Sequence, residues 1–222
     1  MKGLFVKDLI IVKNQSKSLL AFLALGFFMS MSMKDNAGIV YMAMIISMFS
    51  LSTIGYDEFD NGFRFLFTLP ASKKAYVREK YLFFILCLVI GIVAGCLIGF
   101  PAELLKDTGS VQNYLDTLGE SIIGSVCVGA IYAGLLIPIR VKYDAEKAKL
   151  VNFAVLGGIA AVCYFLFKMK DKLPEGFAAK VIEFLEGLSD VQIASILIAG
   201  SIVILLVSEV IAERIIAKKE YS

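Results

Sequence analysis

The sequence contains no histidine among its 222 residues. Histidine is the commonest metal ligand and the only side chain that titrates near neutrality when unperturbed, so its absence argues against a zinc enzyme and a histidine-based triad. No C-x-x-C motif occurs, and all the cysteines lie inside hydrophobic stretches, at Cys87, Cys96, Cys127 and Cys163. We therefore expect neither a metal site nor disulfides, and interpret these cysteines as small apolar packing residues.

Apolar residues, in contrast, make up 59% of the sequence, and the mean hydropathy is +0.80. They gather in six stretches, at residues 19–33, 37–56, 81–100, 121–139, 150–167 and 191–211. Stretches of this kind cross a hydrocarbon layer of about 30 Å as helices, because the backbone has to satisfy its own hydrogen bonds there. The first stretch, of 15 residues, would span only with flanking polar residues or local thinning of the bilayer. We predict an all-α fold, a polytopic membrane helical bundle of six transmembrane helices, as one domain over residues 1–222.

The distribution of lysine and arginine predicts the orientation of this bundle. Segments 1–18, 57–80, 140–149 and 212–222 hold 16 of the 22 basic residues, and the intervening loops hold six. Because basic residues are enriched in cytoplasmic loops, we expect both termini in the cytoplasm.

Two further helices are predicted outside the spans. Residues 1–18 mix apolar residues with lysines, which favours a helix along the inner membrane surface, although its apolar positions wrap most of the circumference. Residues 175–188 place their apolar side chains on one arc and their charges on the other. This pattern is typical of an amphipathic helix on the outer side before the last span; a short helix packed on a soluble-type loop is the alternative.

Charged residues are almost absent from the hydrophobic stretches. Glu209 and Glu213 are the only candidates, and the basic residues Arg214, Lys218 and Lys219 near them indicate a position at the membrane interface. Ionisable residues inside a membrane mark ion and proton pathways, so their scarcity argues against an ion-coupled carrier. The absence of histidine and of an acidic pair at mid-bilayer depth also disfavours an intramembrane enzyme.

The loop at residues 57–80 is the most informative segment. Phenylalanine recurs there at every fourth position, at Phe59, Phe63 and Phe67. This spacing predicts a short helix along the membrane surface that is broken at Leu69-Pro70. Ser72 can then cap a second short helix that carries the basic residues Lys73, Lys74, Arg78 and Lys80. Two short helices around a proline indicate a docking element for another protein; a basic loop held by anionic lipid is the alternative.

Residues of several types follow one another here in a definite order, namely Asp57-Glu58, Leu69-Pro70, Ser72, Lys73, Tyr76-Val77 and Lys80-Tyr81. This order resembles the permease subunits of ABC transporters of the type-2 exporter class, in their compact bacterial form. Six spans, a cytoplasmic N-terminal helix and an outer helix before the last span agree with that family. Lys73 stands where arginine is common, and residues 65–67 are unusually aromatic.

The resemblance implies that this loop is the coupling helix, which sits in a groove of a separate ATP-binding cassette subunit. The residues that would contact that subunit are Glu58, Leu69, Pro70, Ser72, Lys73, Tyr76 and Arg78. No G-x-x-x-x-G-K-[ST] phosphate-binding loop occurs in the chain. We therefore expect no enzymatic activity and no cofactor on this chain, with ATP and magnesium bound by the partner.

We predict an exporter permease of the bacterial plasma membrane that works by alternating access. Six spans are few for a translocation path, so we expect a second permease copy, in a homodimer or in a heterodimer with a sister chain. Serine, threonine, tyrosine, methionine and phenylalanine in the spans suit an amphipathic or apolar cargo, such as a peptide or lipid-like molecule. Membrane lipid is the other expected contact, and nucleic acid is not expected. An ATP-independent channel or secondary carrier is the alternative.

Small residues repeat every fourth position in the third stretch, at Gly91, Gly95 and Gly99. The fourth stretch carries Gly129, Ala130, Ala133 and Gly134. Small faces of this kind let two helices approach closely. They predict either a seam between subunits or close packing within one subunit, and we favour the second.

Overall fold

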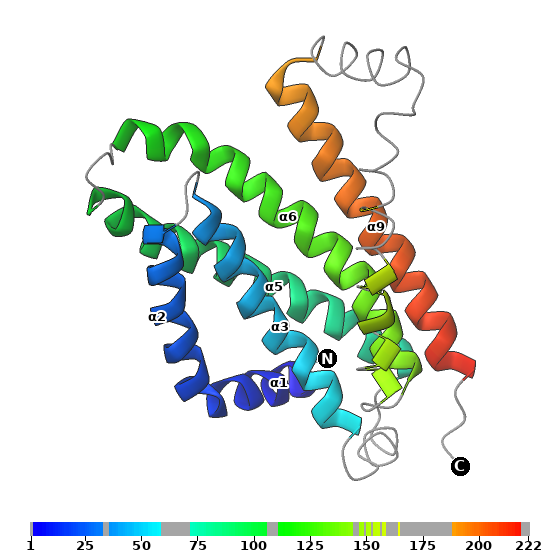
Figure 1. Cartoon of the computed structure of the whole chain (residues 1–222). Helices are drawn as coiled ribbons and strands as arrows, with labels where there is room; N and C mark the ends of the chain where they lie inside the picture. Colours follow the sequence, from blue (N-terminus) through cyan, green and yellow to red (C-terminus); the bar gives the residue numbers. More distant parts are fainter. Residues whose placement is uncertain are drawn as a thin grey trace.

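The computed structural model describes residues 2–32, 36–58, 72–105, 111–143, 147–148, 150–151, 153–155, 157–158, 164 and 188–218. Within these residues the regular structure is helical, which agrees with the predicted all-α fold. The helices are α1 (Lys2–Asn14), α2 (Ser16–Ser32), α3 (Ala37–Glu58), α5 (Lys73–Leu104), α6 (Val111–Lys142) and α9 (Asp190–Lys218) (Figure 1).

Four of the described helices are long and apolar enough to cross a membrane, over Ala37–Asp57, Lys73–Leu104, Tyr114–Lys142 and Asp190–Lys218. A fifth candidate is the pair Gly3–Asn14 and Lys17–Ser32, which is bent by 68° at the break between α1 and α2. The predicted span at 150–167 and the predicted outer helix at 175–188 lie largely outside the described residues. The chain is therefore a multi-pass membrane protein with four or five candidate spans in its described part.

The directions of the helices follow from their contacts. α3 and α5 run antiparallel, because Thr53 meets Lys80 at one end while Ile39 meets Gly95 at the other. α6 and α9 run parallel, because Cys127 contacts Ser201 and Gly134 contacts Ser208 (Figure 1). Consequently α6 ends and α9 begins at opposite ends of the bundle, as a further span between them requires.

Glycines bring α5 and α3 together within this one chain. A Cβ atom on Gly91 would lie 2.7 Å from Ala43 Cα, and one on Gly95 would lie 2.8 Å from Ile39 Cα. One turn further, a Cβ atom on Gly99 would instead lie 3.5 Å from a ring carbon of Tyr114. Because any side chain at the first two positions would collide with backbone, this part of the repeat is a helix-packing face inside the subunit.

The structure corrects the predicted ends of two helices. Ser72 caps a helix as predicted, but α5 then runs without a break to Leu104, so the second short helix of the loop is the beginning of the third span. The predicted outer loop at 101–120 is shorter, since α5 continues past Pro101 and α6 begins at Val111. From hydropathy, the charged first turns of α5 are expected to be exposed to water. In the structure, however, neighbouring helices bury Glu79 and Lys80.

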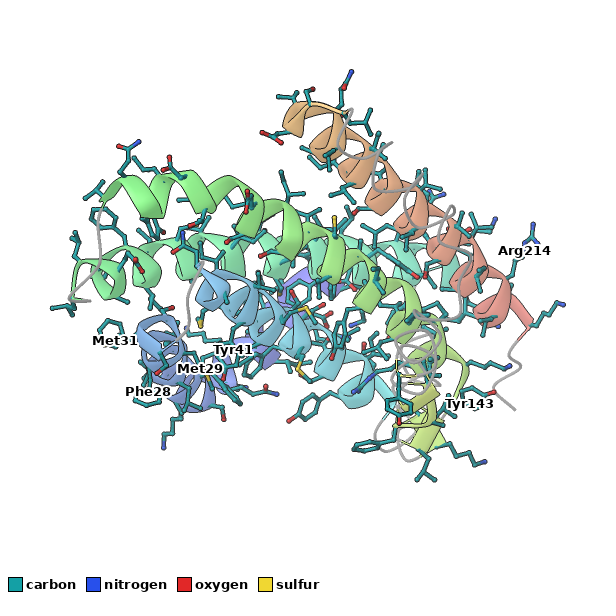
Figure 2. All side chains as sticks on the ribbon, turned by 45° about the horizontal axis from the view of Figure 1, so that its top comes forward. Phe28, Met29, Met31, Tyr41, Tyr143 and Arg214 are labelled. Carbon is teal, nitrogen blue, oxygen red and sulfur yellow. The ribbon has the colours of Figure 1, made fainter. Side chains whose placement is uncertain are left out.

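Large apolar side chains cover much of the outer surface of the bundle. On α2, Phe28 and Met31 point away from the other helices (Figure 2), and Phe28 is 65% exposed. On α5, Leu97 is 71% exposed. An outer surface of this composition fits hydrocarbon rather than water, in agreement with a membrane bundle.

Candidate functional site

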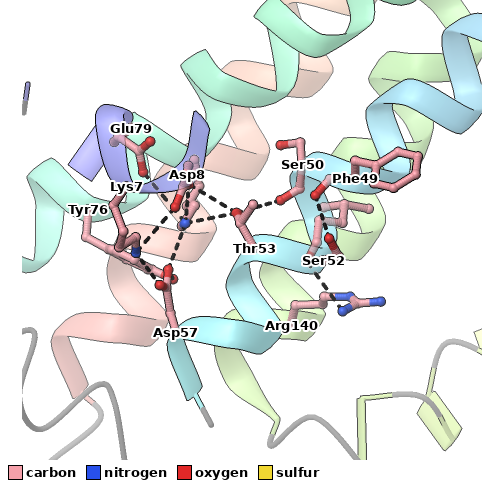
Figure 3. A network of polar contacts seen from close by, with 12 residues as sticks. Lys7, Asp8, Phe49, Ser50, Ser52, Thr53, Asp57, Tyr76, Glu79 and Arg140 are labelled. Carbon is pink, nitrogen blue, oxygen red and sulfur yellow. Dashed lines mark hydrogen bonds and ion pairs between the residues drawn. The ribbon is translucent and has the colours of Figure 1, made fainter. Parts of the chain in front are cut away.

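The helix α1 lies across one end of the bundle, where α3 ends and α5 begins (Figure 1). Seven side chains from these three helices meet there, and we call them the ionic junction: Lys7, Asp8, Thr53, Asp57, Tyr76, Glu79 and Lys80 (Figure 3). The segment 59–71, which joins α3 to α5, lies outside the described residues. The junction therefore lies directly at both roots of that segment.

Lys80 is the centre of the ionic junction. Its Nζ atom lies 2.7 Å from Asp57 Oδ2, donates to Thr53 Oγ1 at 3.0 Å and forms an ion pair with Asp8. The side chain of Lys80 is only 1% exposed, and that of Asp8 is fully buried. A single ammonium group thus joins α5 to both α3 and α1.

Asp57 receives further contacts from α1 and α5. Lys7 forms an ion pair with it, and the Tyr76 hydroxyl donates to its Oδ2 atom at 3.1 Å. Lys7 Nζ also lies 3.3 Å from Asp8 Oδ1, and Lys80 Nζ lies 5.2 Å from the centre of the Tyr76 ring. The two lysines and two aspartates therefore neutralise one another inside the protein.

Helical spacing explains why these residues meet. Thr53 and Asp57 are four residues apart on α3, and Tyr76 and Lys80 are four residues apart on α5, so each pair shares a helix face. Burying an unpaired charge costs several kcal/mol, and a buried ion pair offsets that cost only with good geometry and further hydrogen bonds. The hydroxyls of Thr53 and Tyr76 supply such bonds.

Glu79 differs from the other members of the junction. Glu79 is only 2% exposed, yet within the described residues neither of its carboxylate oxygens has a hydrogen-bond partner. Its nearest charge partner is Lys80, whose Nζ atom lies 3.8 Å from Glu79 Oε2. Two ammonium groups thus face three carboxyl groups at this site, so the junction holds more acid than base.

A second ionic contact joins α5 to α9. Arg78 Nε lies 3.4 Å from Glu209 Oε1 and 3.2 Å from Glu213 Oε1. The side chain of Arg78 is 58% exposed, so solvent weakens these ion pairs much more than those of Lys80. In the described part of the chain, no cluster of three or more acidic or cysteine side chains is suited to a metal ion.

A family model described as ABC-2 family transporter protein matches residues 3–217, which is nearly the whole chain. The chain belongs to this family. The resemblance inferred from the loop at 57–80 is thereby confirmed, and the protein is a type-2 ABC permease. Permeases of this family generally work with an ABC ATP-binding partner. No curated protein and no solved structure matches the chain.

The residues predicted to contact that partner lie in different surroundings in the ABC-2 permease. Ser72 accepts a hydrogen bond from Ala75 N at 3.1 Å as the N-cap of α5, and Lys73 follows it, partly exposed. Tyr76 is fully buried in the ionic junction, and Arg78 pairs with α9. Glu58 is the last residue of α3, and Leu69 and Pro70 lie outside the described residues.

Sequence reasoning missed the contribution of α1 to the site of this permease. Asp8 is the only acidic residue among the first 34, within a helix that is otherwise apolar and basic. That isolation was the available signal, because a single acid among lysines indicates a specific buried partner. Its partner, Lys80, lies 72 positions further along the chain, so spacing alone could not identify the pair.

Proposed function

We propose that this ABC-2 permease is the membrane subunit of an ATP-driven exporter, and that its ATP-binding cassette subunit binds the loop at 57–80, around residues 69–73. The ionic junction is the observation that carries this proposal. It ties together both roots of the segment: Asp57 lies one residue before the end of α3, and Lys80 lies in the second turn of α5. A displacement of the segment would therefore move α1, α3 and α5 together.

The packing beyond the junction supports transmission along the same helices. The close contacts of Gly91 and Gly95 with α3 hold α3 and α5 against each other towards the far end of the bundle. The contacts of Arg78 with Glu209 and Glu213 of α9 are more exposed than those of the junction. In the proposed mechanism, closure of the ATPase subunits pushes the α1–α3–α5 unit relative to α6 and α9, which alternates access to the two sides.

We assign the junction end of the bundle to the cytoplasm of a bacterial cell, with both termini on that side. The surplus of basic residues in the segments at this end supports the assignment. Residues 150–167 then form the fifth of six spans, and residues 175–188 form an outer helix before α9. The parallel directions of α6 and α9 support this count (Figure 1). Residues 1–222 form one permease domain in this proposal.

The proposed complex contains two permease chains, identical or sister chains, and ATP-binding subunits that hold ATP and magnesium. Its cargo is amphipathic or apolar. A groove between α6 and α9 supports this cargo class, since it measures about 390 Å³ and is lined almost entirely by apolar side chains such as Ile131, Leu135 and Val207.

The test is purification of the full chain from its native cells in mild detergent, with identification of any bound P-loop ATPase by mass spectrometry. The variant Lys73→Glu places an acid where the proposed interface is basic, and we expect it to bind the ATPase at least about tenfold more weakly. Arg78 is not used for this test, because reversing it would also repel Glu209 and Glu213 within the permease.

The matched control is Lys142→Glu, which reverses an exposed lysine at the same end of the bundle but outside the loop at 57–80. It should retain the ATPase. The proposal fails if no ATPase accompanies the wild-type chain, or if Lys73→Glu binds the ATPase as tightly as Lys142→Glu does. A channel or carrier that works without ATP predicts the first of these results.

A further inference from the structure

A groove of about 380 Å³ lies at the bend between α1 and α2, against α3. Four apolar side chains form most of it, namely Phe22 of α2 and Ile45, Met48 and Phe49 of α3. The rings of Phe22 and Phe49 meet edge to face with their centres 5.9 Å apart. Met48 is 52% exposed, so the groove is open to the surroundings of the bundle.

The ends of this groove differ in polarity. Gln15 lies in the bend itself, and Ser52 lies near the junction end of α3, whereas Ile45 lies two turns deeper. From Ser52 to Ile45 the groove follows α3 for about 10 Å, at 1.5 Å per residue. Since α1 crosses the end of the bundle and α2 runs along it, the polar end of the groove lies at the level of α1 and the apolar end deeper along the bundle (Figure 1).

Positive charge lies next to the polar end in the sequence. Lys13 and Lys17 lie two residues on either side of Gln15, and both are exposed. Within the described residues neither lysine forms an ion pair, because the nearby acids Asp8 and Asp57 are buried against Lys7 and Lys80. The first turn of α2 contains no acidic residue, and the N-terminus of a helix adds further positive potential.

We propose that this groove binds one anionic phospholipid in each chain. One acyl chain lies against Phe22, Met48 and Phe49, and the phosphate lies beside Lys13 and Lys17. The two halves of the site have the two chemistries of this ligand, an apolar trough in hydrocarbon and unneutralised lysines at the surface. A lipid in this position contacts both sides of the α1–α2 bend and so stabilises the angle at which α1 reaches the ionic junction.

The occupant is a lipid rather than a protein segment, because the apolar wall of the groove, with Met48 52% exposed, is open to the surroundings of a membrane bundle. A free phosphate ion fits only the charged end and would leave the aromatic wall exposed. This proposal concerns a bound lipid and does not depend on the ATPase or the exported cargo.

The experiment is a lipid titration of the full chain in detergent, followed by native mass spectrometry. The probes are dioleoylphosphatidylglycerol, which is anionic, and dioleoylphosphatidylcholine, which has the same acyl chains and no net charge. We expect one tightly bound phosphatidylglycerol per chain. Lys13→Gln with Lys17→Gln should weaken it about thirtyfold, as about 1 kcal/mol for each lysine implies.

Matched variants separate charge from other effects. Lys13→Arg with Lys17→Arg keeps the charge and should keep the affinity. Lys74→Gln with Lys218→Gln removes two exposed lysines from other helices and should also keep it. Ser52→Leu narrows the groove and should weaken both lipids, although the lysines are intact.

Three results would overturn the proposal. One is wild-type affinity for phosphatidylglycerol in the Lys13→Gln, Lys17→Gln variant, and another is equal affinity of the wild type for the two lipids, which indicates unspecific lipid contact. The third is displacement of phosphatidylglycerol by glycerol phosphate at equal concentration, which indicates a site for a free phosphate. Because Lys13 and Lys17 are exposed, the variants at these positions should fold, so their affinity for phosphatidylglycerol can be measured.

Discussion

The helices α3 and α9 both pack against α5, but they differ in how far the protein buries them. In the most apolar part of α3, 61% of the residues are buried inside the protein, whereas in α9 the share is 11%. At the base of α3 the contacts are buried ion pairs to α1 and α5. At the contact of α9 with α6, Ser208 donates a hydrogen bond to Gly134 O, and Ile204 packs against Gly134.

This difference indicates which parts of the permease can move relative to each other. A buried ion pair is strong in one geometry only, because a shift of an ångström or two leaves a charge unpaired in a poorly polar environment. A contact of small side chains and single hydrogen bonds loses much less when helices slide. We therefore expect α1, α3 and α5 to behave as one unit, with α9 as the element that adjusts.

The largest expected effect comes from removing the central charge of the ionic junction. Lys80→Met leaves Asp8 and Asp57 buried with less compensation, so the free energy of unfolding should fall by about 3–5 kcal/mol. Denaturation with sodium dodecyl sulfate in mixed micelles measures this change. Lys74→Met, an exposed lysine on the same helix, should change it by less than about 0.5 kcal/mol. Equal values for the two variants would contradict the buried network.

The second effect tests the glycine contacts of α5. Gly91→Ala places a methyl group 2.7 Å from Ala43 Cα, which should cost about 1–3 kcal/mol of unfolding free energy. Gly200→Ala makes the same chemical change on α9, where nothing lies within 4 Å, and should be neutral or stabilise by up to about 1 kcal/mol. The same denaturation assay compares them. If Gly200→Ala is the more harmful, the packing contrast between α3 and α9 is wrong.

A smaller effect is expected at the contact between α9 and its neighbours. Ser208 donates to Gly134 O at 2.8 Å and lies 2.6 Å from the Tyr81 hydroxyl. Ser208→Ala should therefore lower the unfolding free energy by about 0.6–1.7 kcal/mol. Ser195→Ala is the control, since Ser195 is exposed and, among the described residues, bonds only within α9. A loss as large as that of Lys80→Met would show that this contact is no more adaptable than the junction.

The smallest effect concerns the exposed ion pairs of Arg78. Arg78→Gln removes its contacts with Glu209 and Glu213, but solvent already screens them, so the loss should stay below about 1 kcal/mol. Raising the salt concentration should reduce the difference further between wild type and variant, while the effect of Lys80→Met persists. Unfolding free energies measured at low and high salt check this. A stability loss of Arg78→Gln that does not change with salt would contradict the exposed position of the Arg78 side chain.

Local composition was enough to predict most of the helices. The stretches at 37–56 and 191–211 correspond to α3 (Ala37–Glu58) and α9 (Asp190–Lys218), because long runs of apolar residues are stable in hydrocarbon only as helices. The N-cap at Ser72 was also predictable, since its side chain bonds to the backbone three residues on. These features depend on near neighbours in the sequence.

The candidate site was only partly predictable. The resemblance directed attention to Tyr76 as a contact residue, whereas its side chain lies buried beneath Asp57 and Lys80. The sequence around Lys7 and Asp8 predicts a surface helix with poor amphipathicity. That pattern has a physical cause, because α1 buries Asp8 on its protein side and exposes Val6 and Ile10 on the other. A hydrophobic pattern alone would place Val6 and Ile10 on the buried face of α1 and Asp8 on its exposed face.

The sequence by itself determined a multi-pass helical membrane protein and its family, since these depend on runs of apolar residues and on a short ordered motif. Only the tertiary structure decided that Lys80 is an interior residue and that α1 joins the end of α3 to the start of α5. The reason is the cost of burying charge: Lys80 can leave water only where Asp8 and Asp57 meet it, and folding alone brings those three residues together.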